Sequence, residues 1–377
     1  MSIWVIICFT MTLAYAMLIL IYYVGWLFIP KPKIFPIHAP KQGFSILVPA
    51  RNEAQHIEAC VQAIIRQDYP NSLFELIVMN DHSTDRTAEI VQTIATQYPQ
   101  IHIRLIHAEE RGVSGKKACI TAAISEAAFD YICLTDADCT RGVNWLNAIN
   151  ESLQTRSAQL IYAPVFFSSN NLFEQSQALE FMGLLGIGAA AIQLKNPNMC
   201  SAANLIFNKE VFFKIGGYTG NENLASGDDE FLLHKVFKLY PEEVYFLKDA
   251  RAIVETSPNG SLQELTQQRR RWVSKSTKYE NRYITAILVG AYLFNFSIFW
   301  NFFAAFYIPS LWKVFIIQIL VKMVAEGLLI HAVLRFFKKG KLIVLLPLVE
   351  PFHVLYVLII GIWANVQNFT WKERSLK

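Results

Sequence analysis

The sequence predicts an α/β domain with a mainly parallel sheet flanked by helices, plus one N-terminal and about three C-terminal transmembrane helices. Within residues 44–135, short apolar runs alternate with segments whose apolar residues recur at helical spacing, which is typical of βαβ units. Outside that region, four apolar runs exceed the roughly 20 residues that a helix needs to cross the hydrocarbon core. We therefore expect a polar domain joined to a membrane part.

Composition supports this division. Of the 377 residues, 53% are hydrophobic and 17% are charged, whereas soluble domains carry about 25% charged residues. The net charge of +4 and the pI of about 8.6 are lower than is typical of a protein with a basic surface that binds nucleic acid, so no nucleic-acid partner is expected. The six cysteines form no CxxC pair, which argues against a disulfide framework or a zinc site. No protein partner can be identified.

The first apolar run, residues 3–29, contains no charged residue and is not preceded by Lys or Arg. A secretory signal peptide cleaved after the Ala-Tyr-Ala sequence ending at Ala16 is the alternative interpretation. The run continues for 13 residues beyond Ala16, which favours an uncleaved anchor. Three more runs follow near the other end of the chain, at residues 283–308, 310–334 and 342–366.

Basic residues near the ends of these runs predict the orientation. Three groups, within residues 31–33, 269–278 and 335–341, all lie on one side if there are four spans, so that side should be cytoplasmic. The basic tail at 372–377 argues mildly against this, or against the fourth run being a full span. We expect a multi-pass protein of the cytoplasmic membrane with an N-terminal anchor (1–30), a cytoplasmic domain (31–282), and C-terminal transmembrane helices with a short tail (283–377).

In the polar domain, strands are expected over residues 44–49, 74–79, 101–106 and 131–135, and helices over 53–67, 87–97 and 114–128. Ligands of such sheets bind beyond the carboxyl ends of the strands. The apolar segment 181–194 is too short to span a membrane. It is either an interfacial or acceptor-binding helix or a buried core helix.

Polar residues follow three of the predicted strands: Pro49, Arg51 and Glu53 after the first, Asn80, Asp81 and Asp85 after the second, and Asp136 and Asp138 after the fourth. In an extended chain, residues two apart project to the same side, so Asp136 and Asp138 converge. Their repulsion favours a bound cation, and Mg²⁺ or Mn²⁺ carrying substrate phosphates would supply it. Asp81 and Asp85 could instead be turn or capping residues.

Two more polar groups lie further along the chain. Asp228 and Asp229 open a stretch with helical periodicity, where carboxylates are also favourable with the helix dipole. The sequence Gln-Arg-Arg-Arg-Trp at 268–272 precedes the second apolar run, where a basic cluster could simply attract anionic lipid. In the predicted spans, Lys322, Glu326, Glu350 and His353 are costly in lipid and are either a structural pairing or functional.

Together these motifs resemble the membrane-integral branch of the family 2 glycosyltransferases, which includes cellulose and poly-N-acetylglucosamine synthases and the ceramide and diacylglycerol glucosyltransferases. The resemblance covers about residues 44–280 and the flanking spans. It implies a GT-A-like fold and inverting, metal-dependent transfer from a nucleotide sugar, a UDP-sugar by preference, to a lipid or glycan acceptor near the bilayer. In these relatives a Glu-Asp pair often stands where this chain has Asp228-Asp229, which changes the reach by one methylene.

The resemblance also implies residue roles. The residues expected to bind the donor are Pro49, Arg51, Glu53, Asp81, Lys116 and Asp136. Asp138 is expected to ligate Mg²⁺ or Mn²⁺, and Asp229 to be the general base. The residues expected to close over the pyrophosphate and the acceptor are Gln268, Arg271 and Trp272.

Two other functions remain open at this point. The same motifs occur in processive polysaccharide synthases, although four spans are few for a self-contained channel. An inactive membrane scaffold is the third interpretation, and the intact set of acidic motif residues speaks against it.

Overall fold

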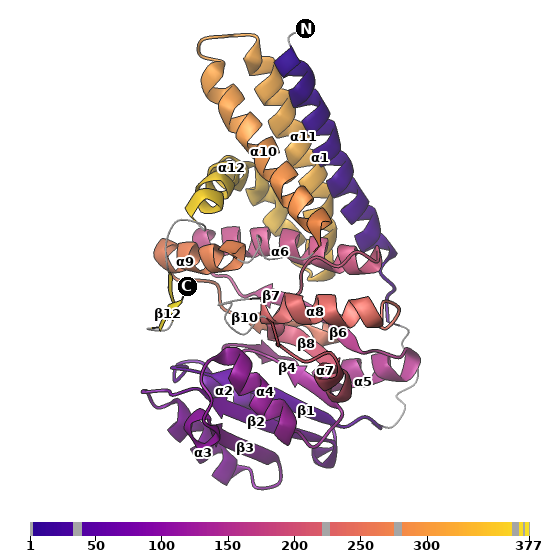
Figure 1. Ribbon diagram of the computed structural model, residues 1–377, viewed down its shortest axis with the longest axis vertical. Helices are drawn as coiled ribbons and strands as arrows, with labels where there is room; N and C mark the ends of the chain where they lie inside the picture. The colour runs from indigo at the N-terminus through magenta and orange to yellow at the C-terminus, as the bar shows by residue number, and fades with distance from the viewer. Residues whose placement is uncertain are drawn as a thin grey trace.

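The computed structural model describes residues 3–32, 40–220, 227–274 and 281–363, and the backbone of 369–371 and 374–376. A helical bundle forms one end of the molecule and an α/β domain the other (Figure 1). The strands are β1 (Phe44–Ala50), β2 (Phe74–Asn80), β3 (His102–His107), β4 (Tyr131–Leu134), β5 (Thr140–Arg141), β6 (Leu160–Tyr162), β7 (Val165–Phe167), β8 (Leu205–Asn208), β9 (Val244–Phe246), β10 (Val254–Thr256), β11 (Phe369–Trp371) and β12 (Arg374–Leu376).

The helices are α1 (Ile3–Phe28), α2 (Ile57–Ile65), α3 (Thr87–Gln97), α4 (Lys116–Glu126), α5 (Trp145–Thr155), α6 (Leu172–Gln193), α7 (Lys209–Lys214), α8 (Asp228–Leu239), α9 (Leu262–Ser274), α10 (Arg282–Ala304), α11 (Leu311–Phe336) and α12 (Leu346–Trp363). The four strands predicted from apolar runs are present as β1 to β4. The helix expected over 53–67 begins only at Ile57, because the preceding backbone is bonded to the neighbouring loop.

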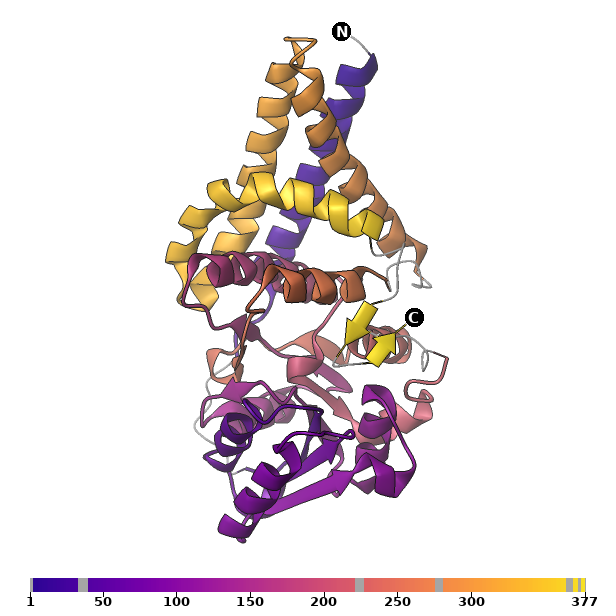
Figure 2. The ribbon, with the colours of Figure 1, turned by 90° about the vertical axis from the view of Figure 1, so that its left-hand side faces the viewer.

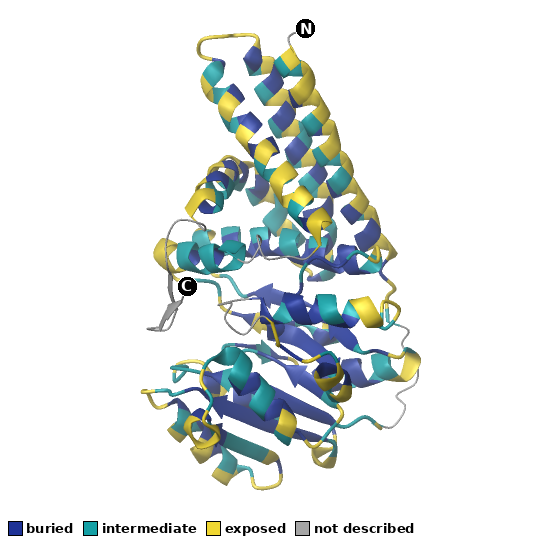
Figure 3. Ribbon diagram, in the orientation of Figure 1, coloured by how far each residue is buried: buried dark blue, intermediate teal, exposed yellow. Residues whose placement is uncertain are grey.

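The main sheet has seven strands in the order β3-β2-β1-β4-β8-β6-β9. Strands β1 to β4 run parallel to one another, and β8 is antiparallel to both β4 and β6. Every residue of β2 is buried, as expected for a strand covered on both faces (Figure 3). A smaller sheet in the order β5-β10-β7 lies beside it. The predicted mainly parallel α/β architecture is therefore confirmed.

Helix α6 lies between the α/β domain and the bundle (Figure 1). It packs on α1 and α11 on one side and on β7 and β9 on the other, and twelve of its residues are buried. The predicted apolar segment 181–194 is the second half of this longer helix. Its burial agrees with a core helix at the junction of the two parts.

Four helices are long and apolar enough to cross a membrane: α1, α10, α11 and α12 together with the short 3-10 turn Gly340–Leu345. Large apolar side chains point outward from them, such as Leu13 of α1, which is 63% exposed. Figures 1 and 2 show α1, α10 and α11 running side by side along the long axis, whereas α12 runs across them near α9. The fourth apolar run is therefore a helix, but its direction differs from that of the other three.

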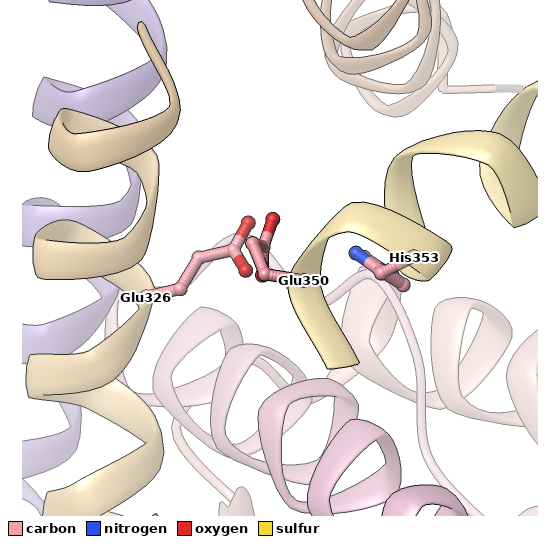
Figure 4. Close-up of side chains that lie close together, drawn as sticks. All are labelled: Glu326, Glu350 and His353. Carbon is pink, nitrogen blue, oxygen red and sulfur yellow. The ribbon is translucent and has the colours of Figure 1, made fainter. Parts of the chain in front are cut away.

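The ionisable residues of the predicted spans form one buried cluster. The Lys322 ammonium, which is 0% exposed, pairs with Glu326 at 2.7 Å and also with Glu350, and it lies 3.4 Å from Nδ1 of His353. Glu326, Glu350 and His353 offer ligand atoms within 4.8 Å of one another (Figure 4). The lysine supplies the positive charge that a metal would otherwise bring, and the pairing joins α11 to α12.

Candidate active site

The loops after β1 and β2 are bonded to each other. Asn52 adopts a left-handed backbone conformation with φ of 51°, and its N–H donates to Oγ of Ser83 at 3.0 Å. The Ala54 N–H donates to Asp85 at 2.9 Å. Burial raises the pKa of Asp85, but hydrogen bonds from Thr87 and from the Ala54 N–H outweigh it and hold the pKa below its usual value. Asp85 therefore ties the two loops together.

The same two loops position Arg51, Glu53 and Asp81. The Arg51 guanidinium donates to the Asp81 carbonyl at 2.9 Å, and the Glu53 N–H donates to Oγ1 of Thr87 at 2.8 Å. The Asp81 side chain is 3% exposed and accepts a 3.3 Å hydrogen bond from the N–H of Gly115, at the start of α4. Three segments that are distant in the sequence are thereby brought to the carboxyl edge of β1 and β2.

Lys116, the first residue of α4, connects the predicted DxD motif to the acidic pair. Its Nζ lies 2.7 Å from Oδ1 of Asp136 and 3.7 Å from Oδ2 of Asp228. Burial lowers the pKa of Lys116, but the two carboxylates outweigh it and raise the pKa above its ordinary value. Lys116 is therefore a fixed positive charge between two acidic segments.

Asp138 lies near Asp136 in the turn that follows β4, where the Cys139 N–H donates to the Asp136 carbonyl at 3.2 Å, and not in the extended chain on which the prediction from their spacing was based. Its Oδ2 accepts a 3.1 Å hydrogen bond from Oγ1 of Thr256 at the end of β10. Burial raises the pKa of Asp138, and the negative charges of Asp136 and Glu53 raise it further. Carboxylates from two loops thus lie near Asp138, and carboxylate oxygens are the ligands that a hard divalent cation such as Mg²⁺ or Mn²⁺ prefers.

Asp229 sits at the start of α8 and is oriented by the backbone. Its Oδ2 accepts from the N–H of Ala202 at 3.1 Å, and its Oδ1 accepts from the N–H of Glu230 at 2.9 Å. The neighbouring Asp228 is 8% exposed and faces Lys116. Both members of the acidic pair therefore face the site, whereas the sequence prediction assigned a role to the second member only.

Arg271 of α9 reaches the same group of charges. Burial lowers the pKa of Arg271, and the carboxylates of Asp228, Asp136 and Asp229 act in the opposite direction. Its charge also affects Lys116. The predicted DxD motif, acidic pair and QxxRW arginine thus meet at one edge of the sheet.

The other QxxRW residues are held by a neighbour that the sequence prediction did not single out. Arg269 is 2% exposed and pairs with Glu180 of α6 at 2.8 Å. It donates to Oε1 of Gln268 at 2.7 Å and stacks over the Trp272 ring at 4.3 Å. The pairing of Arg269 lowers the pKa of Glu180 despite the burial that raises it. The sequence prediction did not single out Arg269, because a run of three arginines does not show which of their side chains faces the interior.

The model of a protein family described as "Glycosyltransferase like family 2" matches residues 40–275, more than half of the chain. The chain belongs to glycosyltransferase family 2. The match spans all the motifs that meet at the sheet edge. The resemblance inferred from the motifs is confirmed, and so is the enzyme class.

Curated relatives of this glycosyltransferase are similar to parts of it. It is 25% identical over 185 residues to glycosyltransferase AglE of Haloferax volcanii, covering 49% of this chain and 58% of AglE. It is 32% identical over 93 residues to the β-monoglucosyldiacylglycerol synthase of Synechocystis, covering 25% of this chain and 19% of the synthase. The chain thus spans less than two thirds of each of these two relatives.

A solved structure matches over nearly the whole length. The mannosyltransferase PcManGT of Pyrobaculum calidifontis, solved in complex with GDP-mannose and Mn²⁺, superposes with a TM-score of 0.58 at 17% identity, covering 96% of this chain and 100% of that chain. At this level of identity the likeness concerns the fold, and it agrees with the predicted GT-A-like architecture.

Proposed function

We propose that this glycosyltransferase moves a sugar from a UDP-sugar donor to a lipid or other membrane-proximal acceptor, with inversion at the anomeric carbon. The observation that carries the proposal is the convergence of Asp136, Asp228 and Arg271 around Lys116 at the carboxyl edge of the sheet, with Asp229 near Arg271. Helix α9, which brings Arg271, lies at the junction between the α/β domain and the bundle (Figure 2). An acceptor held in a bilayer would meet the site there.

The donor is assigned to the loops after β1, β2 and β4. Pro49, Arg51 and Glu53 would line the nucleotide pocket, and Asp81 would hold the base or ribose. Their support is the hydrogen bonding that joins the first two loops into one unit. Because hydrogen bonds already hold these loops in place, they would bind the nucleotide with little loss of conformational entropy.

In the reaction, the acceptor oxygen forms a bond to the anomeric carbon while the bond from that carbon to the diphosphate oxygen breaks. The nucleoside diphosphate leaves with the bonding electrons, and the acceptor proton passes to a carboxylate oxygen of Asp229. The negative charge that develops on the leaving group would be stabilised by Lys116 and Arg271. Gln268 and Trp272 would close over the pyrophosphate and the acceptor sugar.

We assign a divalent metal to Asp138, with the carboxylates of Asp136 and Glu53 nearby. When bound, Mg²⁺ or Mn²⁺ would supply positive charge to the diphosphate of the donor. Asp136, which is paired with Lys116, would contact the donor. We place this domain on the cytoplasmic side of the cytoplasmic membrane, on the strength of the basic residues at the span ends.

The proposal is tested with the full chain in detergent, radiolabelled UDP- and GDP-sugars, and a membrane lipid extract as acceptor. Asp229→Asn should keep UDP binding but lose transfer by about 10²–10⁴-fold, the usual contribution of a general base. Asp138→Ala should lose both transfer and metal-dependent UDP binding. Chelation with EDTA should imitate Asp138→Ala in the unaltered protein.

The matched control is Asp130→Asn, which makes the same change at an exposed residue in the loop before β4. It should transfer sugar like the unaltered protein. Normal transfer by Asp229→Asn would reject the assigned base. Product length separates a single transfer, with one sugar per acceptor, from processive synthesis, which gives a ladder.

A further inference from the structure

A cleft of about 680 Å³ lies away from the residues assigned to catalysis. It is formed by the chain just after α1, by α5, and by β9 with the loop that follows it. Figure 1 places α5 and the end of α1 at one edge of the molecule and α9 at the other. The cleft is therefore distinct from the site at which the motifs meet.

Most of the charged residues that line this cleft, among those described, are basic. The basic residues are Lys31, Lys41, Arg156, Lys248 and Arg251, and the acidic residue is Glu151. Arg251 is neutralised, because its guanidinium pairs with Glu151 at 2.7 Å and with Asp249 at 2.7 Å. Within the described part of the chain, the other four basic side chains form no ion pair. The lining of the cleft therefore carries a net positive charge.

Lys248 and Arg156 are held in place by carbonyl groups and aromatic rings. The Arg156 guanidinium donates to the Glu242 carbonyl at 2.8 Å, and the Glu242 carboxylate, whose pKa is lowered by Lys195 and further by Arg156, lies nearby. The Lys248 ammonium donates to the Trp26 carbonyl at 2.6 Å and lies 4.1 Å from the centre of the Trp26 ring. The Arg156 guanidinium lies 4.4 Å from the centre of the Tyr245 ring. Burial, together with the charge of Lys31, lowers the pKa of Lys248 to about 8. An anion in the cleft would relieve this repulsion.

The cleft begins at the end of an apolar helix. Pro30 and Lys31, which line it, directly follow α1, where Leu27 and Phe28 are 54% and 72% exposed. An apolar surface of this kind faces acyl chains when the helix lies in a bilayer, so the next residues lie at the depth of the headgroups. The cationic hollow therefore opens where lipid phosphates are located.

We propose that this cleft binds the phosphate of an anionic phospholipid in the leaflet next to the α/β domain. Lys31 and Lys41, which are exposed at the rim, would contact the phosphate, with Lys248 and Arg156 deeper in the hollow. Anionic lipids are concentrated in the cytoplasmic leaflet, and basic pockets beside membrane helices bind their headgroups. Binding of this lipid would hold the α/β domain at a fixed distance from the membrane surface. This lipid is distinct from the acceptor of the proposed reaction.

The test measures binding of soluble short-chain lipids to the full chain in neutral detergent by microscale thermophoresis. Phosphatidylglycerol should bind, phosphatidylcholine should not, and inorganic phosphate should bind at least about tenfold more weakly than phosphatidylglycerol. The variant Lys31→Gln/Lys41→Gln should bind phosphatidylglycerol about 25-fold more weakly, taking a factor of about five for each basic residue near an anionic lipid. Both positions are exposed, so the variant should fold.

The control Lys338→Gln/Lys341→Gln removes the same charge from the segment between α11 and α12, outside the cleft. It should leave phosphatidylglycerol binding unchanged. Equal affinities of the two double variants would overturn the proposal, and so would equal binding of phosphatidylglycerol and phosphatidylcholine. Inorganic phosphate binding as tightly as the lipid would assign the cleft to a soluble phosphate and would also overturn it.

Discussion

The guanidinium of Arg269 on α9 and the carboxylate of Glu180 on α6 form a buried ion pair, with Nη2 and Oε2 2.8 Å apart. Two parallel hydrogen bonds, from Nε to Oε1 and from Nη2 to Oε2, fix their relative orientation. The pair holds the helix that carries Gln268 and Trp272 against the helix that packs on the bundle. It is therefore a structural link between residues assigned to the proposed site and the helical bundle.

Breaking this pair from one side should destabilise the protein. Arg269→Met leaves the Glu180 carboxylate buried and uncompensated, and Glu180→Leu does the same to the arginine, at a cost of about 3–5 kcal/mol each. The double variant removes both charges and should recover most of the loss in thermal stability. Unfolding followed by tryptophan fluorescence in detergent measures this. A double variant no more stable than the single ones would show that the pair is not the source of the effect.

Two glycines of α6 should respond in opposite directions to the same substitution. A Cβ on Gly186 would lie 2.7 Å from Cγ2 of Val333 on α11, so Gly186→Ala forces the helices apart at a cost of about 1–3 kcal/mol. A Cβ on Gly183 would lie 3.5 Å from Ile330, an ordinary contact. Gly183→Ala should therefore be neutral or stabilising by up to about 1 kcal/mol, because alanine favours helices. Similar melting temperatures of the two variants would contradict the close packing.

The lysine in the bundle cluster should be replaceable by a metal. Lys322→Ala leaves Glu326, Glu350 and His353 with ligand atoms within 4.8 Å of one another and no positive charge between them. The variant should lose stability and regain part of it when Zn²⁺ or Mn²⁺ is added, because a bound ligand stabilises the folded state. The unaltered protein should not respond in this way. Lys313→Ala, at an exposed residue of α11, serves as the matched control.

The lowered pKa of Lys248 should be visible as its reactivity toward amine reagents. With a pKa of about 8, half of its side chains are neutral and nucleophilic at pH 8, whereas a lysine with an ordinary pKa of about 10.4 is well under 1% neutral there. Acetylation of Lys248, followed by mass spectrometry, should have its midpoint near pH 8. Lys31→Gln removes a repelling charge, so the midpoint should move to higher pH. A midpoint near 10 in the unaltered protein would contradict the description of the cleft.

Much of the α/β domain could be predicted from local pattern. Strands β1, β2 and β4 are mostly apolar runs, and the parallel topology brings the polar residues after them to one edge. These features depend on neighbours in the sequence, so the sequence contains them directly. The two-residue period of an extended chain does not explain the proximity of Asp136 and Asp138, because these residues lie in a turn after β4.

Other features depend on contacts between distant segments. The pairing of Lys116 with Asp228 joins two helices more than a hundred residues apart, and nothing local to either helix indicates it. Arg269 and Arg271 look equivalent in a run of three arginines, yet one pairs with α6 and the other reaches the carboxylates. Hydropathy likewise identified the fourth apolar helix but not its course, because an apolar helix is stable in lipid in either direction.

The crosswise course of α12 bears on how the two ends of the chain would be distributed in a membrane. Figure 2 shows α12 running across α10 and α11, so if those helices and α1 cross a bilayer, we expect α12 not to cross it in their direction and the number of passages to be odd. The two ends of the chain would then lie on opposite faces, with β11 beside α9. The basic residues of the tail sequence, 372–377, would join the other basic groups on one face, and the charge asymmetry that four passages would break would be restored.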